Sequence, residues 1–383
     1  MTVIVNQDDL DQLCAGLART DTVAIDTEFI REKTYWPRIC LIQVAAQGHE
    51  AVIDALASLD LTPLWKVTAN KKITKVLHAA QQDLEIFYQH MGKRKPQNIK
   101  DTQIMAMALG YGEAPSYAYL IESLFGKQLD KSSRLSNWAQ RPLSESQINY
   151  ALQDVRYLLP AYKELNNKLK ANKREHWTEH EYEVMLNPDR YRPNPKQAWQ
   201  RIKGARRNVK HLTTLQGMAQ WREEVAMKSN IPIQWVMRDE VLKQIANERP
   251  TNKKDLGQVR GIASGSVRHY GDKILRIISD SVQKKPPPPE PKKLIANRYT
   301  QVADIMKLLL RQRAAEHKVA TKLIATSAEV DLIVTHGDID TPALKGWRRD
   351  VFGKDALALL RGDIAVRVGP DRTLVFQNQP MTS

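Results

Sequence analysis

The chain has 383 residues, of which 58 are Lys or Arg and 43 are Asp or Glu, giving a formal net charge of +15. No run of about 18 apolar residues occurs and the N-terminus reaches Asp8 without a basic segment, so we expect neither a membrane helix nor a secretory signal. The two cysteines, Cys14 and Cys40, form no metal-type spacing and no disulfide framework, which favours a cytoplasmic protein.

The positive charge is concentrated in the second part of the chain. Residues 1–160 hold 17 Lys and Arg against 18 Asp and Glu, whereas the remaining residues hold 41 against 25. A near-neutral first part joined to a strongly basic second part indicates that the two parts have different functions. The basic part is able to bind a polyanion, and nucleic acid is the usual one. A basic surface without a polyanionic partner is the alternative, and charge alone does not choose between RNA and DNA.

The first part of the chain has the pattern of an α/β domain. A short strand at residues 3–5 and a helix capped by Asn6 or Asp8 precede a buried strand at residues 23–29. Two more strands, 39–45 and 51–54, follow in meander order with tight turns, which indicates a mixed sheet flanked by helices. The next expected elements are a strand at 73–78 and helices at 79–88, 104–109 and 116–125.

Four carboxylates and a tyrosine occupy positions that can converge. Asp26 and Glu28 lie two residues apart on the buried strand, so both project from one face. Asp83 follows a strand at the start of a helix, where sites form in α/β sheets. Asp154 lies one helical turn after Tyr150. Four such groups can hold two Mg²⁺ or Mn²⁺ ions about 4 Å apart for phosphodiester hydrolysis, with Tyr150 orienting the attacking water.

Ordinary structural roles compete with each of these interpretations. An Asp-x-Glu pair can belong to an edge strand with a wet face, and Asp83 can simply favour the dipole of its helix. Tyr150 and Asp154 can form an exposed helix pair. Asp101 is interpreted as the cap of the helix at 104–109 and not as a ligand.

The later part of the chain is mostly helical. A long helix begins at Ser144 with a capping-type signal, bends at Pro160 and continues to about residue 185. A proline-containing linker at 187–195 leads to a helical module, and a polyproline spacer at 284–291 leads to a second set that suggests a diverged repeat. The expected helices are 212–227, 234–247, 251–259 and 267–282 in the first set, and 299–317, 328–335, 342–351 and 354–360 in the second.

The motifs resemble those of a known nuclease family. Asp26-Thr27-Glu28, the segment from His78 to Asp83 and the segment from Tyr150 to Asp154 match the three exonuclease motifs of the DEDD superfamily, in the subgroup with tyrosine. Further segments are similar to bacterial ribonuclease D, and the tail resembles two HRDC domains. These further segments are 25–29, 129–132, 138–143 and 154–160.

The resemblance covers nearly the whole chain and implies its domain organisation. It implies a ribonuclease H-like α/β exonuclease domain followed by two all-α HRDC-type domains, the second more diverged. The implied borders are 1–170 for the exonuclease domain, 171–208 for a helical extension and linker, 209–286 for the first HRDC domain, 287–294 for a Pro-rich linker and 295–383 for the second HRDC-like domain.

The same resemblance implies an activity and a set of site residues. The expected activity is 3′→5′ trimming of tRNA precursors and other small structured RNAs, releasing 5′-mononucleotides, by a monomer with RNA as partner and no membrane. Two divalent ions, Mg²⁺ or Mn²⁺, would be held by the four carboxylates, and Tyr150 would position the water. The residues expected to flank the substrate are His78, which we assign to the site wall, and Lys131, Arg134 and Arg141 of a basic stretch that fits an ordinary loop equally well.

Two other functions remain open at this stage. A DNA 3′→5′ exonuclease of the repair type would use the same carboxylates, because RNA preference depends on contacts to the 2′-hydroxyl that the sequence does not locate. An inactive nucleic-acid-binding scaffold is the second alternative, which a missing carboxylate would have favoured. All four carboxylates are present, together with Tyr150.

Overall fold

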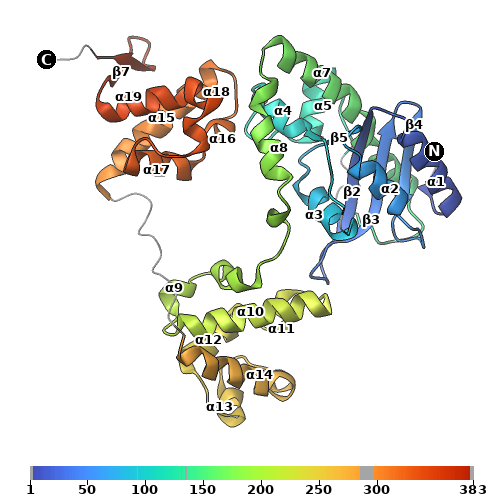
Figure 1. The fold of residues 1–383 in the computed structure, drawn as a ribbon, viewed down its shortest axis with the longest axis vertical. Coiled ribbons are helices and arrows are strands. Elements are labelled where there is room, and N and C mark those ends of the chain that lie inside the picture. Colours follow the sequence, from blue (N-terminus) through green and yellow to red (C-terminus); the bar gives the residue numbers. More distant parts are fainter. Residues whose placement is uncertain (1–2, 93, 131, 134–135, 285–296, 380–383) are drawn as a thin grey trace. The chain divides into compact units, whose positions relative to one another are not determined.

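The computed structural model describes residues 3–92, 94–130, 132–133, 136–284 and 297–379, and the chain divides into two compact units (Figure 1). Each unit combines segments that are far apart in the sequence. The sheet unit comprises Met1–Thr27, Leu41–Asn187 and Glu290–Ser383. The helical unit comprises Glu28–Cys40 and Pro188–Pro289.

A six-stranded mixed sheet with the order β1-β4-β3-β2-β5-β6 forms the centre of the sheet unit. Its β1 runs parallel to β4, β2 to β5 and β5 to β6, whereas β3 and β4 are antiparallel. The predicted mixed sheet is therefore confirmed. The strands are β1 (Val3–Ile4), β2 (Thr22–Ile30), β3 (Arg38–Ala46), β4 (His49–Asp54), β5 (Thr74–Leu77) and β6 (Ile99–Asp101).

The two connections of the β2-β3-β4 meander differ. The β3–β4 turn is tight, as predicted, and Gly48 adopts a φ of +78° there. The β2–β3 connection spans residues 31–37 and is not the tight turn that was expected. The reason is that Tyr35 is buried in the core of the helical unit, with Trp36 packed against it, so the chain needs a longer excursion.

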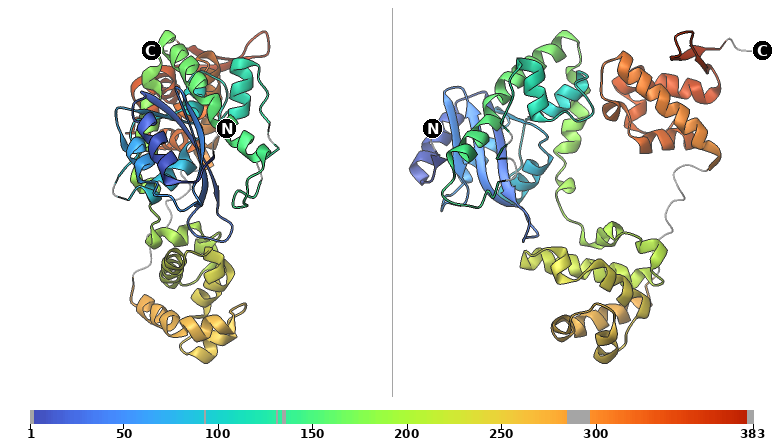
Figure 2. Two further views of the ribbon diagram at one scale, coloured as in Figure 1. Left: turned by 90° about the vertical axis from the view of Figure 1, so that its right-hand side faces the viewer. Right: turned by 180° about the vertical axis from the view of Figure 1, so that it is seen from behind.

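Helices cover both faces of the sheet, and two of them carry predicted site residues: α3 carries Asp83, and α6 carries Tyr150 and Asp154. In Figure 1 α2 lies in front of the sheet, and the view from behind in Figure 2 shows the helices of residues 145–171 across the other face. On that face Val155 and Leu158 pack against Ala24, Ala45 and Val76. The helices are α1 (Gln7–Leu17), α2 (Thr62–Ala69), α3 (Gln81–His90), α4 (Thr102–Ala108), α5 (Tyr117–Phe125), α6 (Glu145–Arg156) and α7 (Leu158–Ala171).

One long helix was predicted from Ser144 to about residue 185. The predicted start is confirmed, but the predicted length is wrong. Ser144 and Gln147 form a complete capping box at the start of α6. The helix ends at Arg156, and Pro160 lies in the first turn of α7, where its missing N–H costs little. Lys173, at a φ of +56°, follows the end of α7, so α8 (Glu179–Met185) is a separate helix.

The helical unit is built around one apolar core. Leu215, Leu242 and Ile274 are fully buried in it. The helix expected at 234–247 is two helices, because Met237 is extended between them. Ala198 and Trp199, upstream of the expected border at 209, belong to the same core. The helices are α9 (Ala205–Asn208), α10 (Leu212–Ser229), α11 (Ile233–Val236), α12 (Asp239–Glu248), α13 (Lys253–Gln258) and α14 (Ser264–Val282).

The C-terminal segment of the sheet unit is helical and ends in a β-hairpin. The expected helix at 342–351 is broken into a 3₁₀ turn, α18 and a π-helical turn at Arg349–Gly353, and the hairpin was not expected. Alternating apolar residues around a Gly-Pro-Asp turn were its available signal. Most of the polyproline spacer lies outside the described residues. The elements are α15 (Thr300–Glu316), α16 (Thr321–Ile324), α17 (Ser327–His336), α18 (Gly346–Arg348), α19 (Lys354–Arg361), β7 (Ile364–Val368) and β8 (Leu374–Asn378).

Candidate active site

Three of the predicted carboxylates meet where β2 and α6 face each other. Asp26, Glu28 and Asp154 each offer an oxygen atom, and these atoms all lie within 4.8 Å of one another. The period-2 geometry of β2 places the first two on one face, and α6 brings Asp154 onto that face. An oxygen-only set of this size and spacing suits a hard divalent cation such as Mg²⁺ or Mn²⁺.

Asp83 occupies a different place from the other three acids. It is buried in the first turn of α3, and its carboxylate accepts a 2.5 Å hydrogen bond from the hydroxyl of Thr27. Thr27 lies between Asp26 and Glu28 in the sequence and therefore projects from the opposite face of β2. The structure thus brings three of the four predicted acids into one cluster and places Asp83 against the strand that carries two of them.

Burial shifts the protonation of two of these acids. Loss of water raises the pKa of Asp83 to about 7, although the hydrogen bond from Thr27 opposes the shift. Burial also raises the pKa of Asp154 to about 7, against a hydrogen bond from Tyr150. Among the described residues, no basic side chain contributes to holding these two carboxylates ionised at neutral pH. A divalent cation would supply a positive partner, so the donor set fits a metal site.

Tyr150 is held beside the cluster from two sides. Its hydroxyl donates the hydrogen bond to Asp154, one helical turn further along α6. Its ring lies 5.8 Å from that of Trp138, which is almost fully buried. This packing fixes the phenol at the edge of the carboxylate cluster.

His78 is held by contacts of both its ring nitrogens. Its Nε2 donates to the carbonyl oxygen of Pro115 over 3.0 Å, and its Nδ1 lies 2.9 Å from the hydroxyl of Thr102. Burial lowers the pKa of His78, which favours the neutral ring. The ring thereby ties the end of β5 to the start of α4 and to the segment before α5.

Arg141 makes a two-pronged ion pair inside the protein. Its Nε and Nη2 donate to the two carboxylate oxygens of Asp54, both over 2.6 Å, and its Nη1 donates to the carbonyl oxygen of Trp138 over 2.8 Å. It therefore anchors the segment that carries Trp138 to the end of β4. Lys131 and Arg134, from the same basic stretch, lie outside the described residues.

Asp101 is a structural cap, as predicted. Its carboxylate accepts from the backbone N–H of Gln103 at the start of α4, over 2.8 Å. It also accepts from the N–H groups of Ala79 and Ala80, over 3.1 and 2.9 Å. Ala79 has a φ of +56°, so these bonds hold the strained turn that leads into α3 and Asp83.

Tyr117 is a site neighbour that the sequence did not reveal. Burial and the charges of Asp154 and Asp26 raise its pKa, which places it close to both acids. Its hydroxyl donates to the carbonyl oxygen of Gln153 over 3.1 Å. The only local signal was its position directly after the helix cap Ser116, which carries no information about function.

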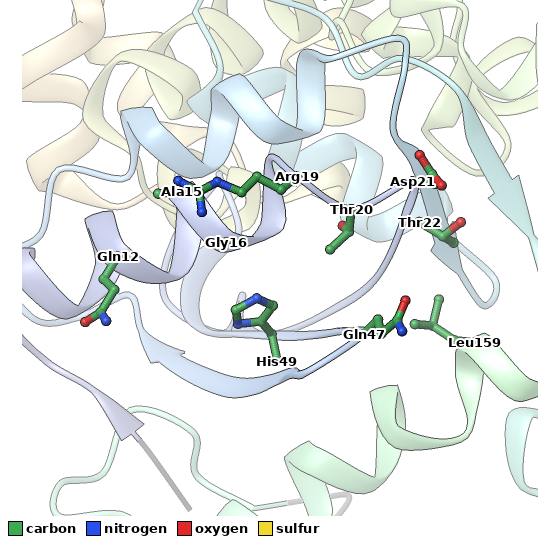
Figure 3. A pocket seen from close by; sticks show the side chains of 10 residues that line it. All are labelled: Gln12, Ala15, Gly16, Arg19, Thr20, Asp21, Thr22, Gln47, His49 and Leu159. Carbon is green, nitrogen blue, oxygen red and sulfur yellow. The ribbon is translucent and has the colours of Figure 1, made fainter.

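A pocket of about 770 Å³ lies beside Asp21 and Thr22 at the start of β2 (Figure 3). The ring of His49 fills the space over Gly16, where an added Cβ atom would come within 2.4 Å of it. None of the predicted site residues is among those that line the pocket, which are Gln12, Ala15, Gly16, Arg19, Thr20, Asp21, Thr22, Gln47, His49 and Leu159.

Comparison with known proteins places the chain among nucleases. Residues 1–170 match the family model described as 3′-5′ exonuclease, and residues 211–278 match the HRDC domain model. Ribonuclease D of Granulibacter bethesdensis is 39% identical over 96% of this chain and 94% of its own length. Ribonuclease D of Zymomonas mobilis is 40% identical over 96% and 95%.

A solved structure agrees with the sequence relatives. RNase D of Escherichia coli, described as an exoribonuclease involved in structured RNA processing, superposes with a TM-score of 0.81 at 29% identity. The match covers 94% of this chain and 98% of that one. The predicted fold class, an exonuclease domain with a mixed sheet followed by a helical HRDC region, is therefore confirmed.

Proposed function

The chain belongs to the ribonuclease D family of 3′→5′ exoribonucleases. On that premise we propose that it trims the 3′ ends of tRNA precursors and other small structured RNAs and releases 5′-mononucleotides. The observation that carries the proposal is the cluster of Asp26, Glu28 and Asp154, whose oxygens lie within 4.8 Å of one another. The role of E. coli RNase D in structured RNA processing supports the substrate class.

The four acids hold two divalent cations, Mg²⁺ or Mn²⁺, in this proposal. Asp26, Glu28 and Asp154 would hold the first. Asp83 is bonded to Thr27 outside this cluster, so it would have to turn towards the cluster to help hold the second. When bound, the cations supply Lewis-acid stabilisation of the negative charge on the phosphodiester. The raised pKa values of Asp83 and Asp154 support this assignment, because buried acids without a positive partner are costly to ionise.

Tyr150 positions the attacking water, since its hydroxyl already points to a metal-binding carboxylate. The water oxygen forms a bond to the terminal phosphorus, the bond from phosphorus to the 3′-oxygen breaks, and that oxygen takes a proton. The last nucleotide leaves with a 5′-phosphate. A phenol has an ordinary pKa of about 10 and is not ionised at neutral pH. Tyr150 therefore orients the attacking water and does not remove its proton.

The other predicted residues support the site in this proposal. His78 forms part of the wall, and Arg141, paired with Asp54, holds the segment of Trp138 against Tyr150. The basic second part of the chain holds the RNA, which its excess of Lys and Arg and the HRDC match support. The borders 1–170, 209–286 and 295–383, a monomer and a cytoplasmic location complete the proposal. The buried free thiols of Cys14 and Cys40 suit a reducing compartment.

A gel time course tests the proposal. A 5′-labelled RNA with a single-stranded 3′ end and the matching DNA are incubated with Mg²⁺, Mn²⁺ or EDTA, with Asp154→Asn as the control variant. We expect a one-nucleotide ladder on RNA that disappears with EDTA and with the variant. A ladder mainly on DNA would identify a repair-type exonuclease instead. Binding of the RNA or the DNA without cleavage would show that the protein is an inactive nucleic-acid-binding scaffold.

A further inference from the structure

The amide of Gln43 is an unexplained polar group in the core of the sheet. Its side chain is completely buried, and within the described part of the chain neither its nitrogen nor its oxygen has a hydrogen-bond partner. Buried amides are nearly always paired, because an unpaired one loses its bonds to water without replacement. A group of this kind calls for a partner that the described side chains do not supply in their present orientation.

The strand geometry places Gln43 next to the carboxylate cluster. Strands β2 and β3 are neighbours joined by residues 31–37, a connection too short for a parallel crossover, so they are antiparallel. Ala24 of β2 and Ala45 of β3 belong to the same apolar cluster beneath α6 and α7. Two residues further along β2 is Asp26, and two residues back along β3 is Gln43. These two side chains therefore project from the same face of the sheet on adjacent strands, and that face carries the cluster.

The strand on the other side of Gln43 is β4, which faces it with an apolar residue between two acids. Its partner across the antiparallel β3–β4 pair is Val52. The helix side of this face is lined by Val155 and Leu158. The same pairing puts Glu50 and Asp54 of β4 on this face too, but Arg156 and Arg141 already bind them. Asp26 is therefore the acid of the carboxylate cluster that an adjacent strand offers to Gln43.

We propose that Gln43 is a positioning residue for the carboxylate site, and that its amide fixes the metal-binding orientation of the Asp26 carboxylate, directly or through one buried water. The inference rests on the proposed role of Asp26 as a metal ligand. Residues that hold a ligand in place are known to change metal affinity by about 10–100-fold when they are lost. The amide remains unpaired until the carboxylate is drawn into its metal-bound orientation.

Isosteric replacement separates this role from a purely structural one. Gln43→Met keeps the volume of the side chain and removes both polar atoms, and Gln43→Leu serves as a second variant if Gln43→Met does not fold. Gln89→Met is the matched control, because its amide nitrogen is also buried without a partner among the described residues, near the far end of α3. Mn²⁺ binding is measured by calorimetry in the absence of RNA, together with thermal melts in EDTA and steady-state kinetics.

The expected result has three parts. Gln43→Met weakens Mn²⁺ binding about tenfold or more and lowers kcat, whereas KM for RNA stays within twofold of wild type. Its melting temperature in EDTA equals or exceeds that of wild type, because an unsatisfied amide has been removed. Gln89→Met changes neither Mn²⁺ binding nor kcat.

Two outcomes would overturn the inference, and they are distinguishable from a failure of the proposed function. An unchanged Mn²⁺ isotherm and unchanged kcat in Gln43→Met would make Gln43 a core amide without a role in the site. Equal loss in Gln89→Met would attribute the effect to general repacking. If wild type and Asp154→Asn bind Mn²⁺ equally well, the metal assignment of the carboxylates itself is wrong, whatever Gln43 does.

Discussion

The acids of the candidate site and a buried acid of the helical unit are treated differently. In the helical unit Glu223 is almost fully buried, yet it accepts hydrogen bonds from the hydroxyl of Tyr35 and from the guanidinium of Arg201, the latter over 2.6 Å. Buried Arg222 is likewise paired with Asp239 over 2.7 Å. In the sheet unit, hydroxyl groups of Thr27 and Tyr150 are the side-chain hydrogen-bond donors that act on the pKa values of Asp83 and Asp154.

The difference separates structural charges from functional ones. A buried ion inside a protein is stable only when an opposite charge or several hydrogen bonds replace its lost water. Glu223 has such partners from the polypeptide, so it needs no ligand. Among the described residues no basic side chain contributes to the shift at Asp83 or Asp154. In the proposed function, a cation from solution would be their partner.

The largest effect is expected from Asp154→Asn. Loss of one carboxylate from the cluster removes several kcal/mol of charge stabilisation, so we expect kcat to fall by about 10³-fold or more. RNA affinity measured in EDTA should stay within twofold, because the basic surface is unchanged. Glu223→Gln is the matched control, since it neutralises a buried acid of the helical unit and should leave kcat unchanged. A loss of native circular dichroism in Asp154→Asn would show that the acid serves folding instead.

The stability of the metal-free protein should respond in opposite directions in the two units. Glu223→Ala leaves the hydroxyl of Tyr35 and the charge of Arg201 without their acceptor, so we expect the free energy of unfolding to fall by about 2–4 kcal/mol. Asp154→Asn removes a partly buried acid whose pKa is raised by loss of water, and should raise that free energy at pH 8. Urea unfolding in EDTA measures both changes, and a stabilising Glu223→Ala would contradict the comparison.

The parts of this comparison that local sequence determines were predictable. Asp26 and Glu28 follow from the period of a strand, and Tyr150 with Asp154 from the period of a helix that Ser144 caps. The partners were not predictable, because they come from distant segments. Thr27 reaches Asp83 across 56 residues, Arg141 reaches Asp54 across 87, and Tyr35 reaches Glu223 across 188. Nothing in the neighbourhood of Tyr35 in the sequence indicates that its loop belongs to the helical unit.

Ionic strength should separate binding from chemistry. If the basic surface contacts about four phosphates of a single strand, RNA affinity should fall by about 50-fold between 50 and 200 mM salt. The clustered carboxylates are partly buried and act at short range, so kcat at saturating RNA should change by less than about twofold over the same range. Filter binding in EDTA and kinetics in Mg²⁺ measure the two quantities. An RNA affinity that does not depend on salt would show that the basic part of the chain does not bind the RNA.

The smallest expected effect is that of pH, and its sign follows from the raised pKa values. Because the pKa values of Asp83 and Asp154 are about 7 in the folded metal-free protein and about 4 when unfolded, their contribution to stability is complete below pH 4 and is lost as pH rises through 7. Melting temperatures in EDTA should therefore decline from pH 5 to pH 8 more steeply in wild type than in Asp154→Asn.

Metal binding reverses this trend, because only the ionised acids hold a cation. Mn²⁺ affinity and kcat at limiting Mn²⁺ should therefore rise by up to about tenfold per pH unit below pH 7, and saturating Mn²⁺ should shift the rise to lower pH. Glu223→Gln should follow the wild-type profile, since its acid is already paired within the protein. The melting temperature of wild type is followed against pH in EDTA and in Mn²⁺. Equal profiles would show that Asp83 and Asp154, like Glu223, need no cation, and the distinction between these acids would disappear.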